Sequence, residues 1–254
     1  TTLVDRILSS HPKVQAAGEL SDFSVALKRA TGTPGPLVLD APTLVAATHV
    51  DLEAVGARYL ETVAGTLGLT GRFTDKMPLN VFFVPALLAA LPGARVICLR
   101  RHPADTVLSN YRQLFATAFS YYAYAYNLAQ TARYTVAFNR LIEAYEVSLP
   151  AARFRIVDYE DIVQDQDAAT RRLLDQCGLA FDPACLAFHE NAAPVATASA
   201  TQVRQPIYTS SMGRWARYRP AMDPALSILS EAGLMAAPED PDAVPGRPGK
   251  APMP

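Results

Sequence analysis

A short apolar run that ends in Arg101-His102-Pro103 is the feature that most constrains this chain. The run, residues 94–100, is rich in aliphatic and β-branched side chains, which predicts a buried strand. Pro103 suits the first position of a helix, and Asp105 favours its positively charged start. Arg101 would then lie beside a helix N-terminus, with Ser109 two turns further along. The junction is therefore a candidate anion site, and an ordinary junction with a solvated arginine is the alternative.

Extended segments and amphipathic helices alternate along the rest of the chain. Strands are predicted at residues 14–19, 72–76, 94–100 and 154–159. Helices are predicted at residues 3–9, from residue 21, at 51–67, after a turn at Pro78 as far as 91, and at 168–177, with one or two long helices between 103 and about 145. This order predicts an α/β fold in three layers, with helices on both faces of a mostly parallel sheet.

Composition narrows the class of protein. Half of the residues are hydrophobic, 19% are charged and the net charge is −1, which argues against nucleic acid or a membrane surface as a general partner. No apolar stretch reaches membrane-spanning length. The three cysteines have no metal-like spacing and favour a reducing compartment, so we expect a cytoplasmic protein without a metal.

The C-terminal end differs from the rest. Six of the twenty prolines lie between Pro238 and Pro254, together with two glycines. This composition is typical of a disordered segment. We therefore predict one domain over residues 1–235 and a disordered tail over residues 236–254.

Several short motifs in a fixed order resemble those of the sulfotransferases that use 3′-phosphoadenosine-5′-phosphosulfate. They are Thr1-Thr2-Leu3-Val4 through His11-Pro12, Gly18-Glu19, Asp75-Lys76-Met77-Pro78, Arg101-His102-Pro103 with Ser109, Asp158-Tyr159-Glu160, and Ser199 with Gln202-Val203 and Gly213-Arg214-Trp215. The order looks most like the tyrosylprotein-sulfotransferase-like branch, which in bacteria is often attached to tetratricopeptide repeats. The resemblance runs from Thr1 to about Tyr218.

The resemblance implies a phosphate-loop-type sulfotransferase fold and sulfuryl transfer to a hydroxyl acceptor, with protein tyrosine as the branch-level candidate. It implies no metal, and it leaves open a tetratricopeptide region ahead of Thr1 in the full-length protein. The family's first strand and its Pro-Arg-Ser-Gly segment do not occur before Thr1, so we expect either that the sequence is a fragment or that the first strand was lost; as given, the sequence does not contain the arginine of that loop. Small alcohols, sugars and lipids remain alternative acceptors.

The resemblance also implies roles for the residues around the reacting group. Thr1 and Thr2 would hold the 5′-phosphosulfate, and helix capping is the structural alternative. Glu19 would be the general base that takes the acceptor's proton. Lys76 would neutralise charge on the oxygen between phosphate and sulfate. Without the resemblance, we would interpret Glu19 as a surface charge and Lys76 as a solvated lysine that forms a surface ion pair with Asp75.

A second group of residues is expected to bind the rest of the donor. Arg101 and Ser109 match the residues that bind the 3′-phosphate. Tyr159 is expected near the adenosine, and Ser199 and Arg214 near the phosphates. The family branch can carry one more arginine, but Gln113 occupies that position and the adjacent Arg112 points about 100° around the helix.

Other interpretations remain open from the sequence. The aromatic cluster Phe119, Tyr121, Tyr122, Tyr124 and Tyr126 is either packing, which its helical spacing favours, or an acceptor-binding wall. A phosphate-loop nucleotide kinase would share the helix-on-phosphate geometry, although no Gly-Lys-Ser/Thr loop is visible. A non-catalytic remnant of the fold that binds nucleotide or protein is the third possibility.

Overall fold

The computed structural model describes residues 1–117, 120–193 and 202–236, which form two compact units. The first unit contains Thr1–Arg101 and Leu141–Ser211. The second contains His102–Arg140 and the described residues from Met212 on. Ser199, Phe119 and all but the first residue of the predicted tail lie outside the described residues.

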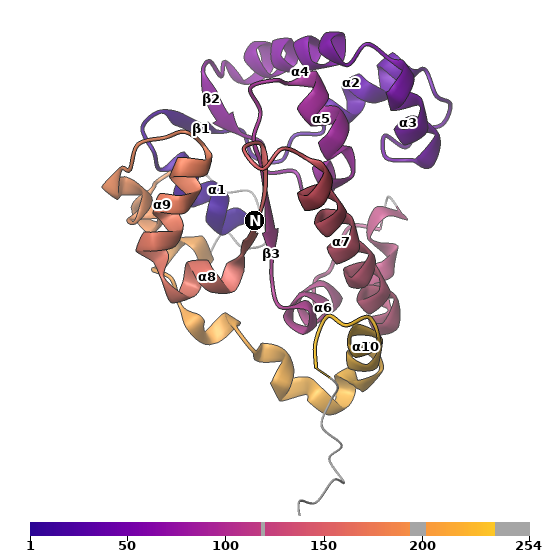
Figure 1. Ribbon diagram of the computed structural model, residues 1–254, viewed down its shortest axis with the longest axis vertical. Helices are drawn as coiled ribbons and strands as arrows, with labels where there is room; N and C mark the ends of the chain where they lie inside the picture. The colour runs from indigo at the N-terminus through magenta and orange to yellow at the C-terminus, as the bar shows by residue number, and fades with distance from the viewer. Residues whose placement is uncertain (118–119, 194–201, 237–254) are drawn as a thin grey trace, which may run out of the picture. The chain divides into compact units, whose positions relative to one another are not determined.

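Helices and short parallel strands alternate in the first unit (Figure 1). Its strands are β1 (Val14–Ala16), β2 (Arg72–Thr74), β3 (Val96–Arg100) and β4 (Phe154–Asp158). Its helices are α1 (Thr2–Ser9), α2 (Asp22–Thr31), α3 (Ala41–Ala46), α4 (Leu52–Leu67), α5 (Val84–Ala90), α8 (Tyr159–Gln164) and α9 (Gln166–Gln176). Short 3₁₀ turns are η1 (Ala47–His49), η2 (Pro78–Phe83), η4 (Pro183–Cys185), η5 (Phe188–Glu190), η6 (Gln202–Arg204) and η7 (Thr209–Ser211).

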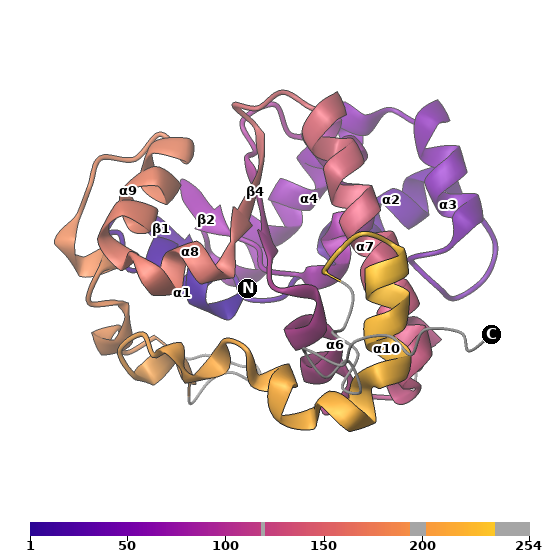
Figure 2. The ribbon, with the colours of Figure 1, turned by 60° about the horizontal axis from the view of Figure 1, so that its bottom comes forward.

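The second unit is helical in the part that the structure describes (Figure 2). It contains α6 (Pro103–Tyr111), η3 (Ser120–Tyr126), η8 (Arg214–Tyr218) and α10 (Arg219–Glu231). Helix α7 (Leu128–Ser148) belongs to this unit as far as Arg140 and continues into the first unit.

The strands pair in parallel, which confirms the predicted α/β class. β1 pairs with β2, with Val14 opposite Arg72, and β3 pairs with β4, with Arg100 opposite Asp158. Among the described residues these two ladders are not joined into one continuous sheet. The β1–β2 ladder is only three residues long because the backbone turns away after Ala16 and Thr74 into the loops that carry the candidate site.

Local sequence signals explain where most helices begin and end. The side chain of Asp51 accepts a hydrogen bond from the backbone N–H of Ala54 and so caps α4. Gly68, in the left-handed conformation, ends the same helix. Pro103 begins α6 at the predicted place. The sequence interpretation missed α3, which is capped by Asp40, and also α8 and α10.

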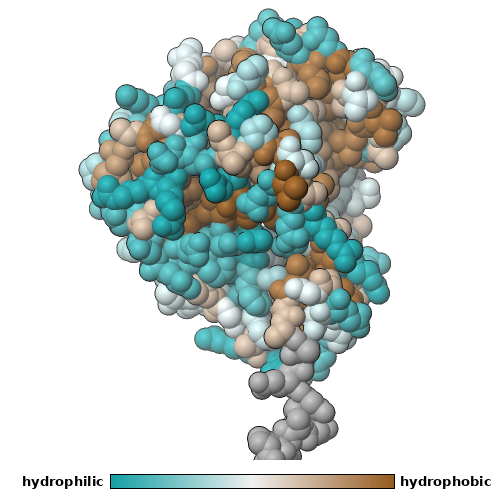
Figure 3. Space-filling model, in the orientation of Figure 1, coloured by the Kyte–Doolittle hydropathy of each residue, from teal (hydrophilic) through white to brown (hydrophobic). Residues whose placement is uncertain are grey.

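Each unit has its own hydrophobic core. In the first unit, one cluster joins α1 to α8 and α9, and a second joins α2, α4 and α5. In the second unit, α6, α7 and α10 bury a third cluster. Polar and apolar residues are interspersed on the face that Figure 3 shows. Within the described residues, no helix is both long enough and apolar enough to cross a membrane.

Candidate functional site

Glu19 and Lys76 come together because they follow two paired parallel strands. β1 ends at Ala16 and β2 at Thr74, so the loops after both strands leave the same edge of the ladder. The backbone N–H of Lys76 donates to the carbonyl of Gly18 at 2.7 Å. The Lys76 ammonium forms an ion pair with Oε1 of Glu19. The lysine side chain is 8% exposed and that of Glu19 is 41% exposed, so only the carboxylate faces solvent.

The partner of Lys76 is Glu19, and Asp75 has a different task. Oδ1 of Asp75 accepts hydrogen bonds from the backbone N–H groups of Leu20 at 3.3 Å and Met77 at 3.2 Å. Its Oδ2 accepts from the hydroxyl of Tyr59 at 3.0 Å and from Nδ2 of Asn80 at 3.2 Å. Asp75 therefore holds together the residue after Glu19 and the residue after Lys76.

Burial shifts the titration of this network. Desolvation raises the pKa of Asp75, and its hydrogen bonds to Leu20 and Tyr59 act in the opposite direction. Desolvation and the charge of Asp75 raise the pKa of the Tyr59 hydroxyl well above its ordinary value. Tyr59 therefore acts as a hydrogen-bond donor to the carboxylate and does not ionise in the physiological range.

The amino end of α1 lies among cationic groups. Both ribbon views show it beside β3 (Figures 1 and 2). Thr1 is exposed, and Lys76 is close enough to its backbone nitrogen to act on it electrostatically, with a smaller effect of Arg101. Thr1 makes no side-chain capping hydrogen bond, and Thr2 is buried. The helix start, Lys76 and Arg101 thus form a cationic region of the first unit.

Helix α1 is fixed to the strand that precedes Lys76. The hydroxyl of Thr74 donates to Oδ1 of Asp5 at 2.5 Å. Asp5 is 9% exposed, and desolvation raises its pKa. This contact orients the start of α1 relative to the loop that carries Lys76.

Arg101 and Tyr159 are also brought together, each directly after one strand of the β3–β4 ladder. The guanidinium of Arg101 lies 5.2 Å from the centre of the Tyr159 ring. Both residues contact Ser211: Nη2 of Arg101 donates to its carbonyl oxygen, and the two hydroxyls of Tyr159 and Ser211 are 2.7 Å apart. Tyr159 is the first residue of α8, so the strand predicted at residues 154–159 ends one residue earlier, at Asp158.

Ser109 and Arg214 belong to the second unit, and both are exposed there. The segment around Arg214 is held by Asp105, whose carboxylate accepts hydrogen bonds from the backbone N–H groups of Gly213 at 2.7 Å and Trp215 at 3.0 Å. Trp215 also stacks on His102, with ring centres 5.8 Å apart. Asp105 thus joins η8 to the first turn of α6, the helix that carries Ser109.

The aromatic cluster packs within the second unit. Tyr124 stacks on Tyr134, with ring centres 3.7 Å apart, and Tyr122 stacks on Phe115 at 4.5 Å. The hydroxyl of Tyr126 donates to the carbonyl of Phe115. The packing interpretation is therefore confirmed for Tyr122 and Tyr124, whereas Tyr126 is exposed.

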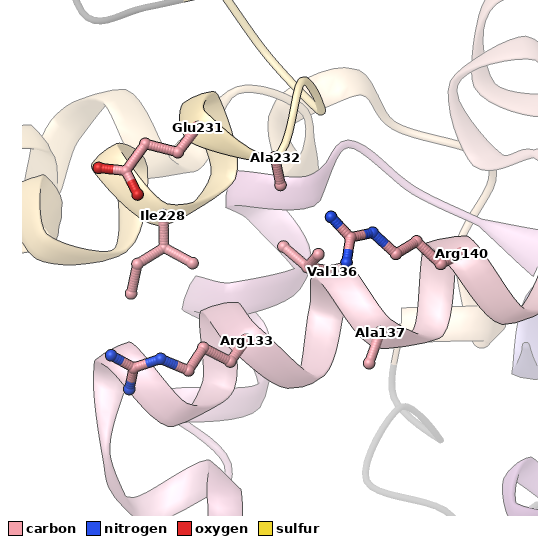
Figure 4. A pocket seen from close by; sticks show the side chains of 7 residues that line it. All are labelled: Arg133, Val136, Ala137, Arg140, Ile228, Glu231 and Ala232. Carbon is pink, nitrogen blue, oxygen red and sulfur yellow. The ribbon is translucent and has the colours of Figure 1, made fainter.

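Among the described residues, those predicted to form the site line neither a metal site nor the depression between α7 and α10. In the part of the chain that the structure describes, no group of three or more His, Cys, Asp or Glu side chains is arranged to hold a metal ion. A shallow depression of about 350 Å³ lies between α7 and α10 of the second unit (Figure 4). Arg133, Arg140 and Glu231 surround an apolar floor there, and none of the predicted site residues lines it.

Sequence reasoning missed two residues of these clusters, Asp75 as an organising carboxylate and Ser211. The sequence does contain a signal for Asp75. An Asp whose carboxylate accepts a hydrogen bond from the backbone N–H two residues later, here Met77 just ahead of Pro78, is typical of an Asx turn. Ser211 had no local signal, because its partners lie 52 and 110 residues away in the sequence.

Comparisons with known proteins agree on one family. A family model described as "Sulfotransferase family" matches residues 1–183. A protein of Aquifex aeolicus (strain VF5), described as an uncharacterized protein, is 31% identical over 235 residues. That alignment covers 91% of this chain and 31% of the relative, so the chain spans about a third of that protein's length.

Two solved structures share the fold. The sulfotransferase domain of the Synechococcus PCC 7002 olefin synthase superposes with a TM-score of 0.58 at 19% identity, covering 85% of this chain and 82% of that domain. The sulfotransferase domain from the curacin biosynthetic pathway superposes with a TM-score of 0.56 at 15% identity, covering 91% of this chain and 93% of that one. At these identities the likeness concerns the fold alone.

Proposed function

Since this chain belongs to the sulfotransferase family, we propose that it transfers a sulfuryl group from 3′-phosphoadenosine-5′-phosphosulfate to a hydroxyl acceptor. The observation that carries the proposal is the ion pair between Glu19 and Lys76 at the carboxyl edge of the β1–β2 ladder. A carboxylate and an ammonium held at one place are the two groups that such a transfer needs.

Glu19 is the general base of the proposed reaction. The acceptor's oxygen forms a bond to sulfur while its proton passes to the carboxylate of Glu19. The ammonium of Lys76 donates a hydrogen bond to Oε1 of Glu19. Because the carboxylate of Glu19 is partly exposed, an acceptor hydroxyl can approach its second oxygen, Oε2. Protein tyrosine is the first acceptor to examine, because the sequence resembles the tyrosylprotein-sulfotransferase-like branch.

Lys76 acts on the leaving group. As the bond between sulfur and the 5′-phosphate oxygen breaks, negative charge develops on that oxygen, and the released product is adenosine 3′,5′-bisphosphate. A buried ammonium beside it stabilises this charge more strongly than a solvated one would. The amino end of α1, with Thr1 and Thr2, supplies backbone N–H groups for the phosphosulfate.

Arg101 and Tyr159 are proposed to bind the adenosine 3′-phosphate end of the donor. Arg101 supplies the cation and Tyr159 an aromatic face. For Ser109, Ser199 and Arg214, roles in donor binding remain predictions from the resemblance.

The donor site is tested by calorimetric titration of the 254-residue chain with adenosine 3′,5′-bisphosphate, with ADP as the control ligand. We expect tighter binding of the bisphosphate, and an Arg101→Ala variant that binds it about tenfold to hundredfold more weakly, as expected for a lost charged hydrogen bond. Arg155→Ala, which removes an exposed arginine of β4, is the matched control and leaves binding unchanged. Equal affinity for the two ligands would favour a non-catalytic remnant of the fold.

A further inference from the structure

Arg101, Tyr159 and Ser211 form a closed triangle of contacts in the first unit. The guanidinium lies 5.2 Å from the centre of the tyrosine ring, the tyrosine and serine hydroxyls are 2.7 Å apart, and the guanidinium donates to the serine carbonyl. Two of the three contacts belong to Ser211. This residue is 9% exposed, so its hydroxyl is directed into the protein and not into solvent.

The ladder fixes the other two corners of this triangle. Arg100 lies opposite Asp158 in the β3–β4 register, and the two side chains form a double hydrogen bond of 2.7 and 3.0 Å. Arg101 and Tyr159 are the next residues after this pair, so their backbones start from neighbouring positions. Their side chains are long, and the ladder alone does not fix where their ends lie.

Ser211 supplies the missing restraint. The guanidinium of Arg101 donates one N–H to a carbonyl and has a ring on one side. These two contacts together fix the orientation of its plane. The ring that forms this platform is in turn held by its hydroxyl on Ser211. Removing the serine hydroxyl would leave the carbonyl contact in place but release the ring.

We propose that Ser211 is a positioning residue that gives the site its selectivity for a phosphate on the ribose 3′-oxygen, by holding Tyr159 against Arg101. The proposal rests on the proposed function, in which Arg101 binds that phosphate. Ser211 itself does not touch the ligand in this account; it acts through the other two residues.

The decisive readout is a ratio of two affinities. Adenosine 3′,5′-bisphosphate and adenosine 5′-monophosphate differ only in the 3′-phosphate. The dissociation constant of the monophosphate divided by that of the bisphosphate therefore isolates the contribution of the 3′-phosphate. A general loss of structure weakens both ligands together and leaves the ratio unchanged. Loss of the positioning of Arg101 lowers the ratio.

The experiment is calorimetric titration of both ligands into the wild-type chain and four variants, with circular dichroism as the check on folding. Ser211→Ala is expected to lower the ratio about fivefold, the size expected for one lost hydrogen bond. Tyr159→Phe removes the same hydrogen bond from the other side and is expected to lower the ratio equally. Ser211→Thr keeps a hydroxyl and is expected to restore the ratio.

Ser210→Ala is the matched control, since Ser210 is the exposed neighbour in the same turn and its loss is expected to leave the ratio unchanged. The double variant Ser211→Ala/Tyr159→Phe should lose no more than either single variant, because both remove one shared contact. Additive losses would contradict the proposal.

The outcomes separate this proposal from the function on which it rests. A wild-type ratio near one would overturn both, because the chain would then have no 3′-phosphate site. A wild-type preference that survives in both Ser211→Ala and Tyr159→Phe would overturn the role of Ser211 alone. Equal weakening of both ligands in these variants would show a purely structural role and would also overturn it.

Discussion

The ammonium of Lys76 is paired with the carboxylate of Glu19, 57 residues earlier in the chain, and not with the adjacent Asp75. The choice of partner follows from the fold. Asp75 is engaged with the backbone of Leu20 and Met77, which leaves Lys76 to cross to the loop after the neighbouring strand. Glu19 and Lys76, which have proposed chemical roles, are therefore held together by Asp75, which has no proposed chemical role.

Replacing Lys76 by methionine should reduce turnover without preventing donor binding. Methionine keeps much of the side-chain volume but cannot stabilise charge on the leaving oxygen, so we expect kcat to fall about 10²- to 10³-fold. The measurement is transfer of ³⁵S from labelled donor. Lys13→Met, at an exposed lysine of the same unit, is the control. An unchanged kcat in Lys76→Met would remove the lysine from the mechanism.

The buried carboxylate of Asp75 should make stability fall with rising pH. Its folded-state pKa is raised above the ordinary value of 3.8, so the folded protein holds this proton more tightly than the unfolded chain does. Its contribution to stability is therefore complete below pH 3.8 and is lost as the pH rises through the folded-state pKa. Urea unfolding of wild type and Asp75→Asn should show wild type losing stability relative to the variant from pH 4 upward.

Asp40 provides a control of the opposite sign. Its hydrogen bond to Lys28 lowers its pKa to about 2, so its contribution is present above pH 3.8 and is lost as the pH falls through about 2. Relative to Asp40→Asn, wild type should lose stability as the pH falls from 4 to 2. The same trend with pH for both aspartates would contradict the assigned environments.

Two glycines of α4 should respond to alanine in opposite directions. A Cβ on Gly56 would lie 2.1 Å from the carbonyl oxygen of Ala90, so Gly56→Ala must separate α4 from α5, with an expected loss of about 1–3 kcal/mol. Gly65 has nothing within 4 Å of the same position, and Gly65→Ala should stabilise the helix by about 0.5–1 kcal/mol. Thermal unfolding measures both, and equal effects would contradict the α4–α5 packing.

The sequence predicted the elements that local chemistry defines. The helical region predicted from 103 to about 145 is divided into α6, η3 and α7. The strand ending at Arg100, the helix start at Pro103 and the helix capped by Asp51 are found within a few residues of their expected positions. Each depends on a periodic apolar pattern and on a cap or proline whose effect is local. Helix α10 was missed although its side chains form much of the second unit's core, because Pro224 inside it argues against a helix.

The residues of the candidate site were predicted only in part, and from the resemblance to a family instead of from local chemistry. Glu19, Lys76, Arg101 and Tyr159 were assigned by resemblance, and the structure shows which of them meet: Glu19 with Lys76, and Arg101 with Tyr159. The positioning residue Ser211 could not be found this way. Its contacts depend on the three-dimensional path of the chain, and nothing in the neighbouring residues indicates them.

The most direct test of the account is transfer of ³⁵S from labelled 3′-phosphoadenosine-5′-phosphosulfate to a set of hydroxyl acceptors, beginning with tyrosine peptides, by wild type and Glu19→Gln. Glutamine keeps the shape of the side chain but cannot accept the acceptor's proton. We predict transfer by wild type and a kcat about 10²- to 10⁴-fold lower in Glu19→Gln, with bisphosphate affinity nearly unchanged. Glu61→Gln, at an exposed glutamate of α4, should behave as wild type. Undiminished transfer by Glu19→Gln would contradict the proposed mechanism.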